Sequence, residues 1–151
     1  MASPFEILVT AIGGPEVLQS SPINMPLPAP DEVVLAHTAI GVNFVDIYLR
    51  AGQAHSHNPQ PPFVPGINAV GKIIARGSQI QDLQIGQKVT YTNAGVGSYS
   101  THVAVSAERL IPVPPVLDDV RVAGGLVRAL LLLQISACTM TALSAKSTLV
   151  I

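Results

Sequence analysis

All thirteen prolines of this 151-residue chain lie at or before Pro115, and they cut the sequence before it into short segments. Proline lacks an amide hydrogen and fixes φ near about −65°, so recurring prolines exclude long helices and long interior strands. Several segments between the prolines and the twelve glycines are rich in Val, Ile and Thr, which is typical of a β barrel or sandwich. We expect strands at residues 5–10, 16–20, 32–40, 67–76, 88–92 and 98–105.

Two segments of this region bear on a site. In 98–105, Tyr99 and the alternate residues after it predict a buried face, so Ser98 and Ser100 beside His102 are read as the polar face and not as a nucleophile with its base. The loop 53–65 holds four prolines, and we expect it to be irregular and to form a rim beside a pocket.

After Pro115 the composition changes. The run LVRALLLLQISACTMTAL predicts a helix, and the charges of Asp118 and Asp119 favour its N-terminus. The uncharged stretch 129–145 is 17 residues long, at the lower edge of what crosses a bilayer, and it contains several polar residues. We expect a buried or partner-facing helix and no membrane anchor.

Charge and cysteine content exclude several classes of function. Eight Lys and Arg stand against nine Asp and Glu, and 11% of residues are charged, so no basic field for nucleic acid is present. The single Cys138 excludes an internal disulfide and any zinc site built from several cysteines. The N-terminus has no signal-peptide pattern, so we expect a cytoplasmic protein.

The stretch GVNFVDIYLRAG, residues 41–52, predicts a two-turn helix. Asn43 is a good N-cap, Asp46 lies three residues later where a carboxylate accepts from first-turn amides, and Gly52 ends the helix. One helical face carries Phe44, Ile47, Tyr48 and Ala51. We expect that face to dock on the barrel. The residues alone leave open whether Asn43 and Asp46 only cap the helix or also do chemistry.

A family resemblance favours chemistry. The stretches GGPEVLQ, DEVVLAHTAI, GVNFVDIYLRAG, PPFVPGINAVGKI and GQKVTYTNAGVGSYSTHVAVSAERLIPVP occur in the order seen in NADPH-dependent quinone oxidoreductases, the zinc-free branch of the medium-chain dehydrogenase/reductase superfamily. The resemblance implies a mainly β, GroES-like barrel with short helices over residues 1–117. It places residues 118–151, an apolar helical tail, at the interdomain helix, with the chain ending before the Rossmann domain.

The same resemblance assigns a site. Asn43, Asp46 and Tyr48 match family positions that line the nicotinamide and substrate cleft, with Asn43 and Tyr48 on the cofactor side. It implies NADP(H) as cofactor and a quinone or an enone as substrate.

We expect no zinc. Zinc-containing relatives have a cysteine at Asn43 and a His-Glu pair at Ile67 and Asn68, and neither Ile nor a neutral amide is a usual zinc ligand. His55 and His57 form a close pair without a third ligand, so we interpret them as solvated loop residues.

Two amides stand where the family usually has acids. Asn68 and Gln87 can keep part of the hydrogen bonding. If either amide left a buried partner unpaired, the stability of the fold would fall by roughly 1 to 3 kcal/mol.

Two hypotheses for function follow. The first is a truncated quinone oxidoreductase that binds NADPH weakly or not at all and is inactive alone, because the glycine-rich pyrophosphate turn of a Rossmann domain is absent. The second is a non-catalytic binding module that associates through residues 126–143 with itself or with a full-length relative.

Overall fold

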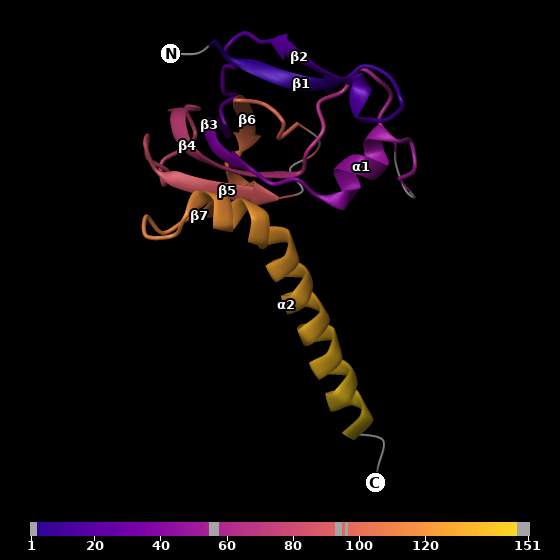
Figure 1. Cartoon of the computed structure of the whole chain (residues 1–151). Helices are drawn as coiled ribbons and strands as arrows, with labels where there is room; N and C mark the ends of the chain where they lie inside the picture. The colour runs from indigo at the N-terminus through magenta and orange to yellow at the C-terminus, as the bar shows by residue number, and fades with distance from the viewer. Residues whose placement is uncertain (1–2, 55–57, 93–94, 96, 148–151) are drawn as a thin grey trace.

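The computed structural model describes residues 3–54, 58–92, 95 and 97–147, and for 138–147 it describes the backbone alone. The strands of this part of the chain are β1 (Phe5–Val9), β2 (Leu18–Pro22), β3 (Glu32–Ile40), β4 (Asn68–Arg76), β5 (Lys88–Thr92), β6 (His102–Ser106) and β7 (Ile111–Pro112). The α-helices are α1 (Phe44–Arg50) and α2 (Asp119–Ser147), and 3-10 turns occur at Pro15–Val17 and Ala107–Arg109. Figure 1 shows the strands gathered into one body from which α2 projects.

Two antiparallel sheets make up the barrel. The larger has the strand order β6-β3-β4-β5-β7, and the smaller pairs β1 with β2. The segment before β6 joins them, because the Ile7 amide of β1 donates to the Tyr99 carbonyl at 2.8 Å and the His37 amide of β3 donates to the Thr101 carbonyl at 2.9 Å. These contacts close the barrel on one side.

The core lies inside the larger sheet. Its buried members come from β3, β4, β5 and β6, and they are Val33, Leu35, Ala69, Ile73, Val89, Tyr91 and Val105. β-branched side chains dominate this set, as expected where a pleated strand packs against its neighbours. The fold class predicted from the sequence is confirmed: the chain is mainly β with short helices, and an apolar C-terminal helix follows.

The strand predictions succeeded best in the larger sheet. The bounds predicted for β3 and β5 agree with the structure, and those for β1 and β4 differ by one residue at one end. β2 begins two residues later than predicted, because Pro15–Val17 forms a 3-10 turn. The short β7 was missed.

The prediction of a strand at 98–105 is wrong in its first half. β6 begins at His102, and Ser98 and Ser100, expected on a polar face, are 1% and 5% exposed. Their segment lies between β1 and β3, so both sides of it are covered. The Ser100 hydroxyl donates to the backbone carbonyl of His102 at 2.7 Å, which is a structural contact and not a catalytic one.

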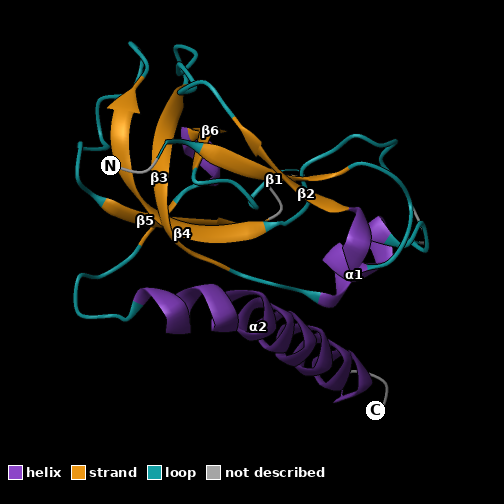
Figure 2. Ribbon diagram, turned by 45° about the horizontal axis from the view of Figure 1, so that its top comes forward, coloured by secondary structure: helices purple, strands orange, loops and turns teal. Residues whose placement is uncertain are grey.

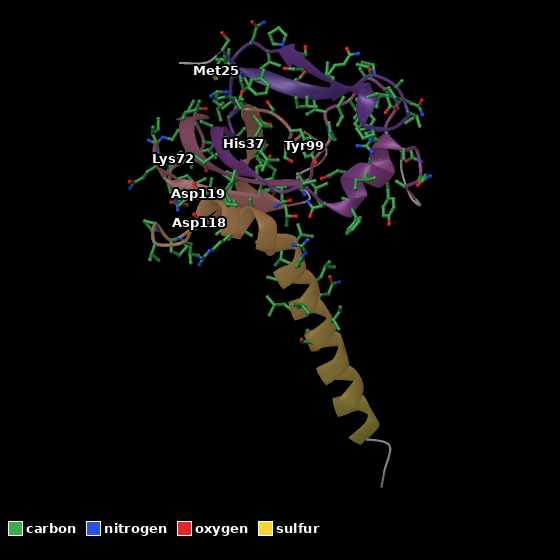
Figure 3. All side chains as sticks on the ribbon, in the orientation of Figure 1. Met25, His37, Lys72, Tyr99, Asp118 and Asp119 are labelled. Atoms are coloured by element: carbon green, nitrogen blue, oxygen red, sulfur yellow. The ribbon has the colours of Figure 1, made fainter. Side chains whose placement is uncertain are left out.

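Polar contacts fasten the first turn of α2 to the barrel. The Asp118 carboxylate accepts from the Arg121 amide at 2.9 Å, so this acid caps the helix as predicted. Asp119 accepts from the Lys88 ammonium at 2.7 Å and from the Thr38 hydroxyl at 2.6 Å. Figure 3 shows Asp118 and Asp119 where α2 meets the barrel.

Beyond its first turns α2 extends away from the barrel. Figure 2 shows the helix running past the sheet, below α1. Leu131, Leu132 and Leu133 are 53%, 66% and 67% exposed. By length and composition Asp119–Ala137 could cross a membrane, but a single such helix is weak evidence that it does.

Candidate functional site

The ends of α1 are determined by the residues that the sequence indicated. Asn43 is the N-cap, and its backbone amide donates to Asp46 Oδ2 at 2.8 Å, which is the reciprocal contact of a capping box. At the other end Gly52 has φ of +70°, and the Gln53 amide donates to the Tyr48 carbonyl at 2.8 Å. This Schellman-type ending requires a left-handed residue, which glycine adopts without strain.

Asp46 is the buried acid of this region. Only 4% of it is exposed, Oδ2 accepts from the Tyr99 hydroxyl at 3.2 Å, and the buried Oδ1 has no hydrogen-bond partner. Burial raises the pKa of Asp46, against the opposing effects of the Asn43 amide and the Tyr99 hydroxyl. Burial and the neighbouring Asp46 charge raise the pKa of Tyr99, so this phenol stays protonated and donates.

Asn68 connects α1 to α2. Its side chain is fully buried, Oδ1 accepts from Asn43 Nδ2 at 2.7 Å, and Nδ2 donates to the Ala123 carbonyl at 2.9 Å. The replacement of an acid by this amide therefore leaves no buried partner unpaired here. Gln87 likewise keeps a turn contact, since its side-chain oxygen accepts from the Gln84 amide at 2.9 Å.

Three adjoining cavities meet at Val42, which is 70% exposed. Their volumes are about 240, 330 and 500 Å³, and Val42 lines all three. We call the resulting depression the Val42 groove. Its walls come from β1 (Phe5, Ile7), α1 (Phe44, Ile47) and α2 (Val127, Leu131). Most of the lining side chains are apolar, as in sites for small organic ligands, and the charged ones are Asp46, Arg50 and Arg128.

Each of the three predicted site residues has a different position relative to this groove. Asn43 lines its part between α1 and α2, Asp46 lines its middle part, and Tyr48 is 47% exposed on α1. Val42, Asn68 and Tyr99 were not predicted as site residues. For Asn68 a signal existed in the sequence, because its amide departs from the family pattern.

The prediction that α1 docks on the barrel through its apolar face is wrong. Phe44 is 73% exposed and Ile47 is 41% exposed, whereas Asp46 and Leu49 are the buried residues of the helix. The capping contacts and the Tyr99 hydroxyl hold Asp46 inward, which turns the apolar face toward the groove. A helix of two turns cannot bury Asp46 and the opposite apolar face against the barrel at the same time.

His37 is a partly buried histidine of β3 that lies beside the core residue Tyr91. Its Nδ1 lies 2.6 Å from the Ser100 carbonyl and therefore carries the hydrogen, and Nε2 accepts from the Tyr91 hydroxyl at 3.1 Å. Burial lowers the pKa of His37, partly offset by the Ser100 carbonyl. This neutral imidazole has both nitrogens satisfied, so its role is structural.

Metal ligands do not gather in the described part of the chain. No group of three or more His, Cys, Asp or Glu residues that could hold a metal occurs there. His55 and His57 lie outside the described residues.

A family comparison agrees with this geometry. Residues 29–115, more than half of the chain, match the model of the alcohol dehydrogenase GroES-like domain. The chain belongs to this family. This GroES-like chain is also 38% identical over 115 residues to 2-haloacrylate reductase of Burkholderia sp, covering 74% of the chain and 34% of the relative. It is 31% identical over 121 residues to quinone oxidoreductase 1 of Escherichia coli (strain K12), covering 78% and 36%.

Solved structures give the same result. The Escherichia coli quinone oxidoreductase complexed with NADPH superposes with a TM-score of 0.73 at 30% identity, covering 79% of this GroES-like chain and 36% of that one. The 2-haloacrylate reductase structure has a TM-score of 0.71 at 34% identity, covering 80% and 35%. The resemblance to quinone oxidoreductases of the medium-chain dehydrogenase/reductase superfamily is confirmed, and the chain spans about a third of the length of these relatives.

Proposed function

We propose that this chain provides the substrate-side wall of an NADP(H)-dependent reductase that acts on a quinone or an enone. The observation that carries the proposal is the Val42 groove, whose apolar walls end at the side-chain amide of Asn43. When bound, NADPH supplies the hydride for such a reduction. The relatives named above, one of them complexed with NADPH, support the oxidoreductase assignment.

The groove residues have distinct roles in this proposal. Phe44 and Ile47 cover the faces of a planar ring and exclude water from it. Asn43 donates from Nδ2 to a carbonyl oxygen. Asp46 holds Asn43 through the contact with its backbone amide. Tyr48 lies on the same short helix but lines none of the three cavities, and its exposed phenol contacts the cofactor beside the groove.

The ring end of the cofactor fits these residues better than its phosphate end. Every paired strand among the described residues is antiparallel, so that part of the chain contains no βαβ unit with a glycine-rich phosphate turn. Two or three hydrogen bonds from the groove contribute roughly 0.5 to 1.5 kcal/mol each. Micromolar affinity needs about 8 kcal/mol. We therefore infer that residues 1–151 alone bind NADPH more weakly than micromolar and do not turn over.

The groove is tested by filling it. Val42→Trp places an indole in the depression, and Val116→Trp is the matched control because Val116 is 89% exposed and lies outside the groove. NMR titration with duroquinone, whose methyl groups hinder addition of thiols, should shift groove signals in the wild type and in V116W but not in V42W. If the wild type, V116W and V42W bind duroquinone equally, the quinone binds outside the groove.

The cofactor is tested by titrating residues 1–151 with NADPH and following nicotinamide fluorescence. An intact quinone oxidoreductase serves as the positive control. Dissociation in the low micromolar range, or oxidation of NADPH at the rate of the intact enzyme, would show that the inference of weak binding is wrong.

We propose further that the site works without zinc. Both ends of the Asn68 amide are occupied by Asn43 and Ala123, so a metal at this position would have to break two buried hydrogen bonds. Ile67 beside it offers no donor atom. Elemental analysis of purified protein, dialysed without chelator, should find less than about 0.1 zinc per chain.

A second candidate function is association through residues 126–143, in a soluble cytoplasmic protein. Leu132 and Leu133 favour it, because both are about two-thirds exposed on a helix that extends from the barrel. In sedimentation velocity, Leu133→Glu should shift the protein toward monomer, whereas Leu27→Glu, at a site 87% exposed, should not. A wild-type monomer that captures no full-length relative would exclude this function.

A further inference from the structure

Asn68 makes two contacts that no carboxylate could make together. Its oxygen accepts from Asn43 Nδ2 at 2.7 Å, and its nitrogen donates to the Ala123 carbonyl at 2.9 Å. A carboxylate could accept from Asn43, but it would face the Ala123 carbonyl with a second oxygen and repel it. The amide therefore joins the N-cap of α1 to the backbone of α2 through one buried side chain.

The packing of Gly41 shows independently that these groups lie against one another. A Cβ at this position would overlap the side-chain amide of Asn68 and would lie 2.7 Å from the Ala123 carbonyl. The Gly41 amide also donates to the Asn68 backbone carbonyl at 3.1 Å. The chain before α1 thus lies directly under the connection between Asn68 and α2, which restricts where the Asn68 amide can turn.

We propose that Asn68 is a positioning residue, which transmits the docking of α2 to the side-chain amide of Asn43. The path begins where Lys88 and Thr38 fasten Asp119. The docked helix presents the Ala123 carbonyl, and this carbonyl fixes the orientation of Asn68. The Asn68 oxygen then fixes Asn43.

The position of the Asn43 amide defines the ligand group that it can bind. One hydrogen of Nδ2 is taken by Asn68, and the other faces the Gly41 carbonyl at 3.4 Å, a long contact. This second hydrogen is the one available in the groove, so the complementary ligand group is an acceptor such as a carbonyl oxygen. This last step rests on the proposed function, whereas the coupling of α2 to Asn43 does not.

The coupling is tested in the chain without ligand. Thr38→Val is nearly isosteric and removes the hydroxyl that donates to Asp119 at 2.6 Å and also lies 3.3 Å from the Val70 carbonyl. Thr10→Val is the matched control, because its hydroxyl donates to Val17 on the opposite part of the barrel. The measurement is the NMR signal of the Asn43 side-chain NH₂ and its exchange with water, assigned by its loss in Asn43→Ser.

We expect T38V to shift the Asn43 signal and to speed its exchange by up to about tenfold, as for the loss of one net hydrogen bond, while T10V leaves it unchanged. The same substitution is then made in Asn68→Asp, which keeps an acceptor for Asn43 but has no donor for α2. In N68D, T38V should have no further effect on the Asn43 signal. A role of Asn68 in stability alone would not produce this difference between the two backgrounds.

Two results would overturn the inference. One is a T38V effect on Asn43 no larger than that of T10V, and this comparison decides the question even if N68D does not fold. The other is an equal T38V effect with and without Asn68. The two proposals can fail separately. If V42W loses duroquinone binding but T38V does not change the Asn43 signal, the proposed function is supported and only the coupling is wrong.

Discussion

Removal of the Tyr99 hydroxyl should destabilise the barrel in a pH-dependent way. Tyr99→Phe keeps the ring but removes the donor 3.2 Å from Asp46 Oδ2. The carboxylate is 4% exposed and its Oδ1 already lacks a partner, so the Asn43 amide is left as its one hydrogen-bond donor among the described residues. Hydrogen bonds to charged groups contribute about 1.5 to 3 kcal/mol, and we expect a loss of this size near neutral pH.

The pH dependence follows from the direction of the pKa shift. Burial raises the pKa of Asp46 above its ordinary 3.8, so the folded protein takes up this proton before the unfolded chain does. The contribution of Asp46 to the free energy of unfolding is therefore fully present below pH 3.8, and it is lost as the pH rises through the raised pKa of the folded protein. Once the carboxyl is neutral, the Tyr99 contact is an ordinary hydrogen bond of about 0.5 to 1.5 kcal/mol. The cost of Y99F should shrink accordingly in acid.

Urea unfolding near pH 7 and near pH 3.5, below the ordinary pKa of 3.8, measures this change. Tyr48→Phe is the matched control, because Tyr48 is 47% exposed and we expect less than about 0.5 kcal/mol from it at either pH. Titration of other groups cancels when each variant is compared with the wild type at the same pH. A Y99F cost that equals that of Y48F, or that is the same at both pH values, would refute the proposed contact with a buried carboxylate.

Three further predictions concern stability. The wild type should lose stability as the pH falls below about 6.5, because the lowered pKa of His37 keeps this ring neutral when folded while the unfolded chain takes up a proton; His37→Gln should flatten that slope in urea unfolding. Lys88→Met should cost about 0.5 to 1 kcal/mol near pH 7 and less in strong acid, since the Lys88 ammonium holds the pKa of Asp119 below its usual value and the pair is lost as the pH falls through it. In thermal unfolding, Gly41→Ala should lower the Tm because its methyl group overlaps the amide packed there, whereas Gly124→Ala, with open space around it in a helix, should raise stability by up to about 1 kcal/mol.

The local parts of this structure were readable from the sequence. β3 and β5 are runs of β-branched residues bounded by turn signals, and α1 has a capping residue at one end and a glycine at the other. Each of these signals acts over a few residues, so the sequence contains all of the information needed. The capping pair Asn43 and Asp46 was found for the same reason.

The parts that depend on distant partners were not readable. The Asn68 side chain donates to the carbonyl of Ala123, 55 residues later in the chain. A single Asn in the sequence does not indicate which distant carbonyl it contacts. The buried serines Ser98 and Ser100 follow the alternation of a strand, but their segment is covered by β1, which comes from the other end of the chain. The orientation of α1 failed likewise, because hydrophobicity favours docking of Phe44 and Ile47 whereas the bond from Tyr99 to Asp46 turns them outward.

The docking of α2 also determines the part of the Val42 groove that lies between the two helices. One wall of the groove is α1, and the facing wall is the part of α2 that carries Val127 and Leu131. That wall lies just beyond Ala123, whose backbone carbonyl accepts from the Asn68 side chain, and the more exposed Leu132 and Leu133 follow it. The width of the groove is therefore set at Asp119 and Ala123 by polar contacts, and not by burial of the helix along its length. A ligand held between the two helices would stabilise the docked position of α2 by its binding free energy. Ligand binding and helix docking are thus linked in both directions.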